Sequence, residues 1–116
     1  MPASDITLAE HLARYNFALP YCKNKSVLDA ACGSGYGSKK IAVEGEALSV
    51  VGVDVDPEAV QYARDEYCVN AEVYDLESEF PKGNYEVIVS FETIEHLENP
   101  DFFLSQVALS CKRFIF

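Results

Sequence analysis

The chain has 116 residues, 49% hydrophobic and 12% aromatic, a composition that indicates one packed globular domain and excludes a disordered or fibrous protein. Its 19 acidic and 9 basic residues give a formal charge of −10, which disfavours nucleic acid or an anionic membrane surface as a partner. No apolar run approaches the roughly 20 residues of a membrane span. The first residues also lack the pattern of a signal peptide, so we expect a cytoplasmic protein.

Helical and strand patterns alternate along the chain without a linker, repeat or low-complexity tract. The expected elements are a helix over about 5–18 ended by Pro20, a strand over 26–31, a helix over 36–45, a strand over 48–53, a helix begun by Asp56 and Pro57 that reaches Tyr67, strands over 71–74 and 85–90, a helix begun by Asn99 and Pro100, and a strand over 113–116. Five strands separated by helices predict an α/β fold, with a Rossmann-like, doubly wound, mostly parallel sheet in three αβα layers.

Ligands bind such sheets at the carboxyl ends of the strands, where this sequence places glycines and acids. The loop after the first strand contains Gly33 and Gly35, which allow the backbone to approach a ligand at a helix N-terminus. Asp54 ends the second strand 21 residues after Gly33 and suits a carboxylate that accepts hydrogen bonds from both hydroxyls of a ribose. A dinucleotide fingerprint would need Gly or Ala where the chain has Ser38, so a ligand without a pyrophosphate fits better.

Two further acids join this predicted cleft. Asp75 follows the third strand, where a carboxylate can accept from an exocyclic amine, and Asp29 lies at the glycine loop. Together with Asp54 they place three carboxylates around the cleft, which favours a cationic ligand.

The four cysteines have no CxxC pair and no metal-ligand spacing, so we expect free thiols and no metal site. Cys32 stands beside a helix N-terminus, where a nucleophilic thiolate is favoured. Its place within the glycine motif instead favours packing against the first strand.

Four motifs in order resemble those of class I S-adenosylmethionine-dependent methyltransferases, in particular the UbiE/UbiG-like small-molecule group. They are Val27–Gly35, Val51–Asp54, Asp75–Leu76 and Val89–Leu97, and the likeness runs from about residue 11 to the end. The resemblance implies S-adenosylmethionine as cofactor, S-adenosylhomocysteine as product and a small-molecule methyl acceptor.

The resemblance also assigns residues to parts of the cofactor. Those implied to bind it are Asp29, Gly33, Ser34 and Gly35 at the methionine part, Asp54 at the ribose with Val55 beside it, Asp75 at the adenine amino group with Leu76 beside the ring, Phe91 toward the methyl group, and Tyr15 or Arg14 over the methionine end.

His96 is the candidate catalytic residue, as a general base beside Glu92 and Glu95. The resemblance favours a structural role for it instead, because the Glu-His-Leu triplet occurs in the family irrespective of substrate. One departure from the family is Ala31, where a glycine is usual. We expect binding to survive that change if residue 31 keeps an ordinary backbone conformation.

The resemblance implies that residues 1–116 form a single cofactor-binding domain that is truncated, because the family usually continues through a helix and an antiparallel hairpin after the fifth strand. A noncatalytic S-adenosylmethionine-binding module or inactive fragment is therefore the alternative to an enzyme, and an NAD(P)-dependent oxidoreductase is a third reading. A sheet that ends at the fifth strand leaves an exposed edge, through which a homodimer is expected to form.

Overall fold

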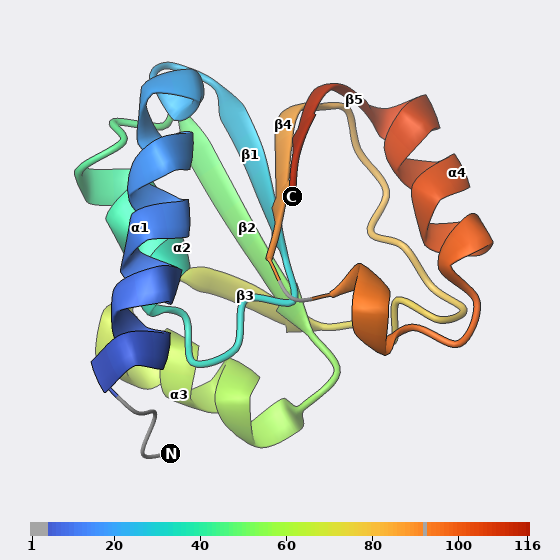
Figure 1. The fold of residues 1–116 in the computed structure, drawn as a ribbon, viewed down its shortest axis with the longest axis horizontal. Helices are drawn as coiled ribbons and strands as arrows, with labels where there is room; N and C mark the ends of the chain where they lie inside the picture. Colours follow the sequence, from blue (N-terminus) through green and yellow to red (C-terminus); the bar gives the residue numbers. More distant parts are fainter. Residues whose placement is uncertain (1–4, 92) are drawn as a thin grey trace.

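The structure is a computed structural model that describes residues 5–91 and 93–116. Five strands and the helices between them form an α/β sandwich (Figure 1). The elements are α1 (Asp5–Cys22), β1 (Ser26–Ala30), α2 (Tyr36–Val43), β2 (Ser49–Asp54), α3 (Pro57–Tyr67), β3 (Asn70–Val73), β4 (Tyr85–Ser90), the single 3-10 turn η1 (Ile94–His96), α4 (Pro100–Ser110) and β5 (Cys111–Ile115).

All strand pairs are parallel, and the sheet order is β3-β2-β1-β4-β5. The chain moves outward from β1 to β3 and then returns to start β4 on the other side of β1, so the strand order reverses between β1 and β4. In open parallel sheets a ligand crevice forms at this switch point, outside the carboxyl ends of the strands. The expected fold class is therefore confirmed, and it fixes where a site can form.

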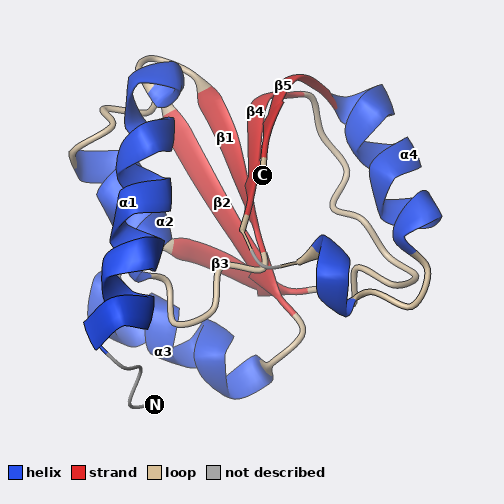
Figure 2. Cartoon of the chain, viewed as in Figure 1, coloured by secondary structure: helices blue, strands red, loops and turns tan. Residues whose placement is uncertain are grey.

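Helices cover both faces of the sheet (Figure 2). On one face, α1 and α2 bury Tyr15, Ala18 and Ile41 against β1 and β4, and α3 packs beside them on β3. On the other face, Phe103 and Val107 of α4 pack on Leu28 and Ile88. β1 is thus covered on both sides, which is why its residues are buried from Val27 onward.

The first helix differs from its expected end. Pro20 was expected to stop it near residue 18, but α1 continues to Cys22 with Pro20 inside its last turn. Proline removes one backbone donor there, but Ala18 and Cys22 are both fully buried against the sheet and hold the turn in place. Packing therefore outweighs the local preference.

Most other boundaries shift by one or two residues. β3 covers 70–73 instead of 71–74 and β5 covers 111–115 instead of 113–116, while η1 is a short turn between β4 and α4 that was not among the expected elements. In the described part of the chain, no helix is long and apolar enough to cross a membrane.

Candidate functional site

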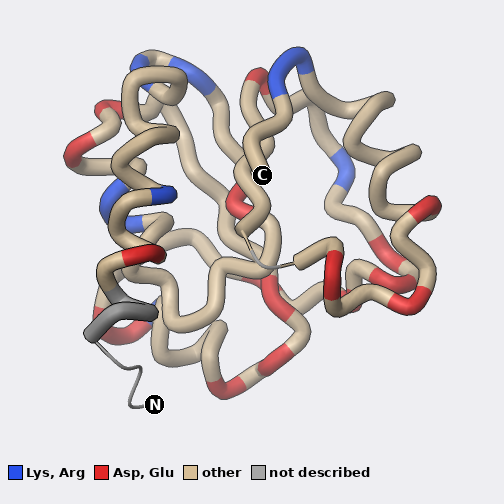
Figure 3. Tube along the Cα trace, in the orientation of Figure 1, with Lys and Arg blue, Asp and Glu red and all other residues tan. Residues whose placement is uncertain are grey.

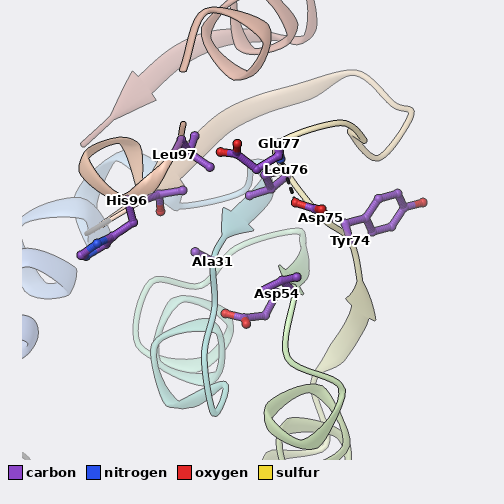
Figure 4. Close-up of a pocket in the computed structure, with 10 residues that line it drawn as sticks. Ala31, Asp54, Tyr74, Asp75, Leu76, Glu77, His96 and Leu97 are labelled. Atoms are coloured by element: carbon purple, nitrogen blue, oxygen red, sulfur yellow. Dashed lines mark hydrogen bonds between the residues drawn. The ribbon is translucent and has the colours of Figure 1, made fainter. Parts of the chain in front are cut away.

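Two cavities open at the carboxyl ends of the strands, and the described residues that line them do not overlap. The smaller has a volume of about 220 Å³ and is lined by Asp54 and Val55 after β2, Tyr74 to Glu77 after β3, Ala31 after β1, and Thr93, His96 and Leu97 after β4 (Figure 4). The larger has a volume of about 470 Å³ and is lined by Arg14, Ser90, Phe91, Ile94, Glu95 and Phe116.

The smaller cavity brings together four residues that the sequence placed at one ligand. Asp54 and Val55 come from one loop and Asp75 and Leu76 from the next, and all four line the same space. Leu76 is buried, with 6% of its surface exposed, so it presents an apolar wall. Asp75 caps its own loop, because its carboxylate accepts a hydrogen bond from the Glu77 N–H at 3.0 Å (Figure 4).

The glycine loop is tied to β2 through Asp54. The Gly33 N–H donates to one oxygen of the Asp54 carboxylate at 2.9 Å, and the Asp56 N–H donates to the other at 3.0 Å. A carboxylate offers about four acceptor positions, so both oxygens retain room for further donors. Gly35 takes a φ of 95° at the start of α2, and a Cβ there would meet the Ala63 Cβ at 2.4 Å. The loop can therefore lie this close to α3 only with glycine.

Asp29 does not stand around the cleft as expected. It is fully buried near the carboxyl end of β1, and neither of the two cavities is lined by it. Its carboxylate accepts hydrogen bonds from the Tyr15 hydroxyl at 3.1 Å and from the Ser38 hydroxyl at 2.8 Å. The reason is its position in the central strand, where Tyr15 of α1 and Ser38 of α2 both contact the side chain.

Burial raises the pKa of the Asp29 carboxyl to about 7, even though the hydrogen bonds from Ser38 and Tyr15 favour its ionised form. Burial and the neighbouring Asp29 also raise the pKa of the Tyr15 hydroxyl well above its ordinary value. The Tyr15 ring lies 5.0 Å from that of Phe91 and 5.7 Å from that of Tyr36. Residues from α1, β1 and α2 therefore form one buried polar cluster edged by aromatic rings.

Ala31 does not keep an ordinary backbone conformation. Its φ is 65°, in the left-handed region where a side chain costs about 1 to 2 kcal/mol relative to glycine. Its methyl group also faces the smaller cavity. We expected binding to survive alanine in place of the family's glycine if residue 31 kept an ordinary backbone conformation, and that condition is not met.

Cys32 packs as a core residue. Only 5% of its surface is exposed, and burial together with Asp29 raises the pKa of its thiol to about 12. A thiol with so high a pKa is a poor nucleophile, so the packing reading is the one the structure supports.

The larger cavity contains two other predicted residues. Phe91 follows β4 and is nearly buried, whereas Arg14 reaches the cavity from α1. Of the remaining predicted residues, Ser34 is exposed in the glycine loop. The predicted cofactor residues thus fall into a group at the smaller cavity, a group at the larger cavity, the glycine loop 33–35, and the buried pair Asp29 and Tyr15.

His96 ends η1 and is exposed. It lines the smaller cavity, and its ring points away from the carboxylates of Asp54 and Asp75 (Figure 4). Glu95, the acid expected beside it, lines the larger cavity instead. Glu92 lies outside the described residues.

Three polar side chains near the site were not found from the sequence. Ser38 was considered only as the residue that breaks a dinucleotide fingerprint, yet it donates to Asp29. The Tyr36 and Ser90 hydroxyls are hidden from solvent and have no hydrogen-bond partner among the described residues. No periodic pattern marks such positions, because what makes them polar sites is their neighbours in space.

Residues 27–113 match the family model described as a methyltransferase domain, which is most of the chain. A probable S-adenosylmethionine-dependent methyltransferase of Mycobacterium tuberculosis is 36% identical over 102 residues, covering 84% of this chain and 36% of that protein. A ribosomal protein L11 methyltransferase of Paraburkholderia phymatum is 40% identical over 70 residues, covering 59% of this chain and 23% of the relative. The chain therefore spans about a third or less of the length of these curated relatives.

A solved structure shares the fold. Magnesium protoporphyrin IX methyltransferase from Synechocystis, with bound S-adenosylhomocysteine, superposes with a TM-score of 0.78 at 17% identity, covering 97% of this chain and 58% of that one. At this level of identity the likeness concerns the fold alone.

Replacing Ala31 with glycine should stabilise the chain, because it removes the left-handed strain of the alanine. We expect Ala31→Gly to raise the free energy of unfolding by up to about 1 kcal/mol, measured by urea denaturation. Ala59→Gly, in the first turn of α3, is the matched control and should lose up to about 1 kcal/mol. A loss of stability in both variants would contradict the assignment of strain to residue 31.

The raised pKa of Asp29 predicts a pH dependence of stability. Between its ordinary value of 3.8 and about 7 the folded chain holds a proton that the unfolded chain has lost, so the free energy of unfolding should fall as the pH rises through this window. The effect is on the order of 4 kcal/mol at full size.

Asp29→Asn should flatten this dependence and be more stable than the wild type at pH 8, as followed by urea denaturation at a series of pH values. Asp65→Asn, on the exposed face of α3, is the control and should keep the wild-type profile. An unchanged slope in Asp29→Asn would assign the pH dependence to other groups.

Proposed function

Since this chain belongs to the class I S-adenosylmethionine-dependent methyltransferases, we propose that it binds S-adenosylmethionine at the carboxyl edge of its sheet and transfers the methyl group to a small-molecule acceptor. The observation that carries the proposal is the smaller cavity, where Asp54 and Asp75, 21 residues apart, meet around one space. The loops after β2 and β3 share no sequence pattern, yet each supplies one carboxylate that can accept hydrogen bonds from a nucleoside, one from the ribose and one from the adenine.

The residues of the smaller cavity suit the adenosine part of the cofactor. Asp54 keeps acceptor positions for the ribose hydroxyls, because its backbone partners use only part of its capacity. Asp75 would accept from the adenine amino group, and Leu76 with Val55 would contact the ring and the sugar. The left-handed Ala31 places only a methyl group against this space.

The methionine part would lie from the glycine loop toward α1. Gly33, Ser34 and Gly35 form this loop, and Tyr36 directly after it holds a hidden hydroxyl without a partner in the described chain. Such an orphaned hydroxyl fits a polar ligand group. Arg14 would pair with the carboxylate of the ligand, and Asp29 beneath Tyr15 would act on its ammonium through the Tyr15 hydroxyl.

The bound cofactor supplies a methyl group on a sulfonium, so the donor is already activated. What the chain contributes is alignment. Phe91, which is buried against the Tyr15 ring and lines the larger cavity, would contact the cofactor on the path of the methyl group and shield that path from water. No side chain needs to form a covalent bond.

Two kinds of methyl acceptor are compatible with the relatives of this chain. The UbiE/UbiG-like resemblance favours a small molecule, whereas the ribosomal protein L11 methyltransferases among the relatives are named for a protein. The alternative of a noncatalytic S-adenosylmethionine-binding module uses the same cavity. It differs only in the absence of turnover with any acceptor.

The cellular setting is also part of the proposal. We place the chain in the cytoplasm, where reducing conditions suit its four free thiols. The outer edge of β5 bears no strand partner in the described sheet, and it would be the contact of a homodimer.

Removing the Asp54 carboxylate should weaken cofactor binding. We expect Asp54→Ala to bind both S-adenosylmethionine and S-adenosylhomocysteine at least about tenfold more weakly by calorimetry, because it loses hydrogen bonds to a charged acceptor. Asp65→Ala, which lines neither cavity, should keep wild-type affinity. A folded Asp54→Ala protein with unchanged affinity would refute the adenosine site.

The position of His96 favours a cofactor contact over general-base catalysis. We expect His96→Ala to weaken S-adenosylhomocysteine binding by about two- to fivefold, as for a residue at the rim of a site. The imidazole resonances should also shift when S-adenosylhomocysteine is added. If affinity and resonances are both unchanged, His96 does not serve the cofactor.

A further inference from the structure

The larger cavity lies between the middle of α1, the carboxyl ends of β4 and β5, and η1, beyond the residues assigned to the adenosine part of the cofactor. Its walls include the side chains of Phe91, Ile94 and Phe116, and it adds the polar residues Arg14, Ser90 and Glu95. A space of about 470 Å³ with three apolar walls suits a compact molecule that has an apolar body and a polar end.

The Ser90 hydroxyl is the first indication of which polar group the ligand carries. Only 2% of its surface is exposed, and its hydroxyl has no hydrogen-bond partner among the described residues. A buried hydroxyl without a partner costs free energy, so such groups in native structures call for an explanation. A donor on a ligand in this cavity would satisfy the Ser90 oxygen.

Charge supplies the second sign, because the two edges of the sheet differ. Around the carboxyl ends of the strands the chain is acidic (Figure 3). The acids there are Asp54, Asp56, Glu58, Asp75, Glu77, Glu79, Glu95, Glu98 and Asp101. The opposite edge is mixed in charge. Lys23, Lys25 and Lys82 precede strands there and Lys112 lies near the start of β5, but Lys23 and Lys25 form ion pairs with Glu46 and Glu86. The resulting field attracts cations to the cavity edge and repels anions.

Among the described residues that line this cavity, Arg14 is the one with a basic side chain, and its charge disfavours a cationic ligand. The proposed function assigns it to the carboxylate of the cofactor, which neutralises it when the cofactor is bound. Among the described side chains of the wall, the charge that remains is then that of Glu95, which is exposed and comes from η1.

We propose that the larger cavity is the acceptor site and that it takes a protonated amine carried on an apolar body. This inference rests on the proposed function and names its substrate class. The ammonium donates to the Ser90 hydroxyl and to the Glu95 carboxylate, and the apolar body packs on Phe91, Ile94 and Phe116. Because an ammonium has three donors and no acceptor, it matches two acceptor groups better than an alcohol or a carboxylate does.

Methyl transfer to such an amine balances without another reactant. The nitrogen first loses a proton to water, and its lone pair then forms the N–C bond while the S–C bond breaks and its electron pair stays on sulfur. Glu95 is exposed, so water reaches the amine end of the cavity and can take the proton.

Three probes of one shape separate charge from size. We would saturate the chain with S-adenosylhomocysteine and titrate it with 2-phenylethylamine, 2-phenylethanol and phenylacetate, following binding by calorimetry and by amide chemical shifts. The amine should bind about tenfold or more tightly than phenylacetate, with the alcohol between them. A fourth probe, Nα-acetyl-lysine amide, represents an amine that comes from a protein side chain.

Substitutions of residues that line the larger cavity test whether the amine binds there. Glu95→Gln should weaken the amine about fivefold and leave the alcohol unchanged, since it removes only the charge. Ser90→Ala should weaken the amine without lowering Tm, because the hydroxyl that it removes has no partner in the described chain. Glu66→Gln, exposed on α3 away from both cavities, is the control and should behave as wild type.

Cofactor binding tests the proposed function, whereas selectivity for the amine tests the nature of the acceptor. If S-adenosylhomocysteine itself does not bind the folded chain, the proposed function fails, and this inference with it. If S-adenosylhomocysteine binds but phenylacetate binds as well as the amine, or Glu95→Gln has no effect, only the inference is overturned. Preference for the lysine probe over 2-phenylethylamine would support the inference with a protein as the source of the amine.

Discussion

One carboxylate, buried in the central strand of the sheet, is the constraint on which the loops at the carboxyl ends of the strands depend. Asp29 lies in β1, covered by both α1 and α2, and an ionised acid is costly there unless its oxygens are hydrogen-bonded. Tyr15 and Ser38 provide those bonds from the two helices. The ring of Tyr15 also lies where a Cβ on residue 37 would be, 2.1 Å from the nearest ring atom, so only glycine admits it. One acid therefore fixes how closely two helices approach the central strand.

That fixed approach positions the loops around it. The glycine loop leaves β1 two residues after Asp29 and starts the helix that contains Ser38, so its path is determined at both ends. Asp54 then holds the loop from the neighbouring strand through the Gly33 N–H. The rigid part of the fold thus sets one wall of the smaller cavity. The residues that give the larger cavity its charge come from α1 and η1 instead.

Folding distributes the acidic net charge unevenly between the two edges of the sheet. Parallel strands all point the same way, so residues that follow strands gather at one edge and residues that precede them gather at the other. In this chain acids predominate after the strands, whereas acids and bases are mixed at the edge where the strands begin (Figure 3). A total of −10 distributed evenly would only aid solubility, whereas this arrangement places a negative field where a ligand enters.

The sequence by itself determined the fold class, the order of the strands along the chain and the loops that follow them, because buried strands, glycines and helix caps are local signals. It also identified Asp54, Val55, Asp75 and Leu76, which the fold brings to one cavity. Tertiary structure decided the rest. Packing against the sheet allows α1 to extend past Pro20. The backbone of Ala31 adopts the left-handed conformation, and Asp29 is buried beneath two helices instead of lining the cleft. The hidden hydroxyls of Tyr36 and Ser90 likewise depend on neighbours distant in the chain, and no local pattern specifies such contacts.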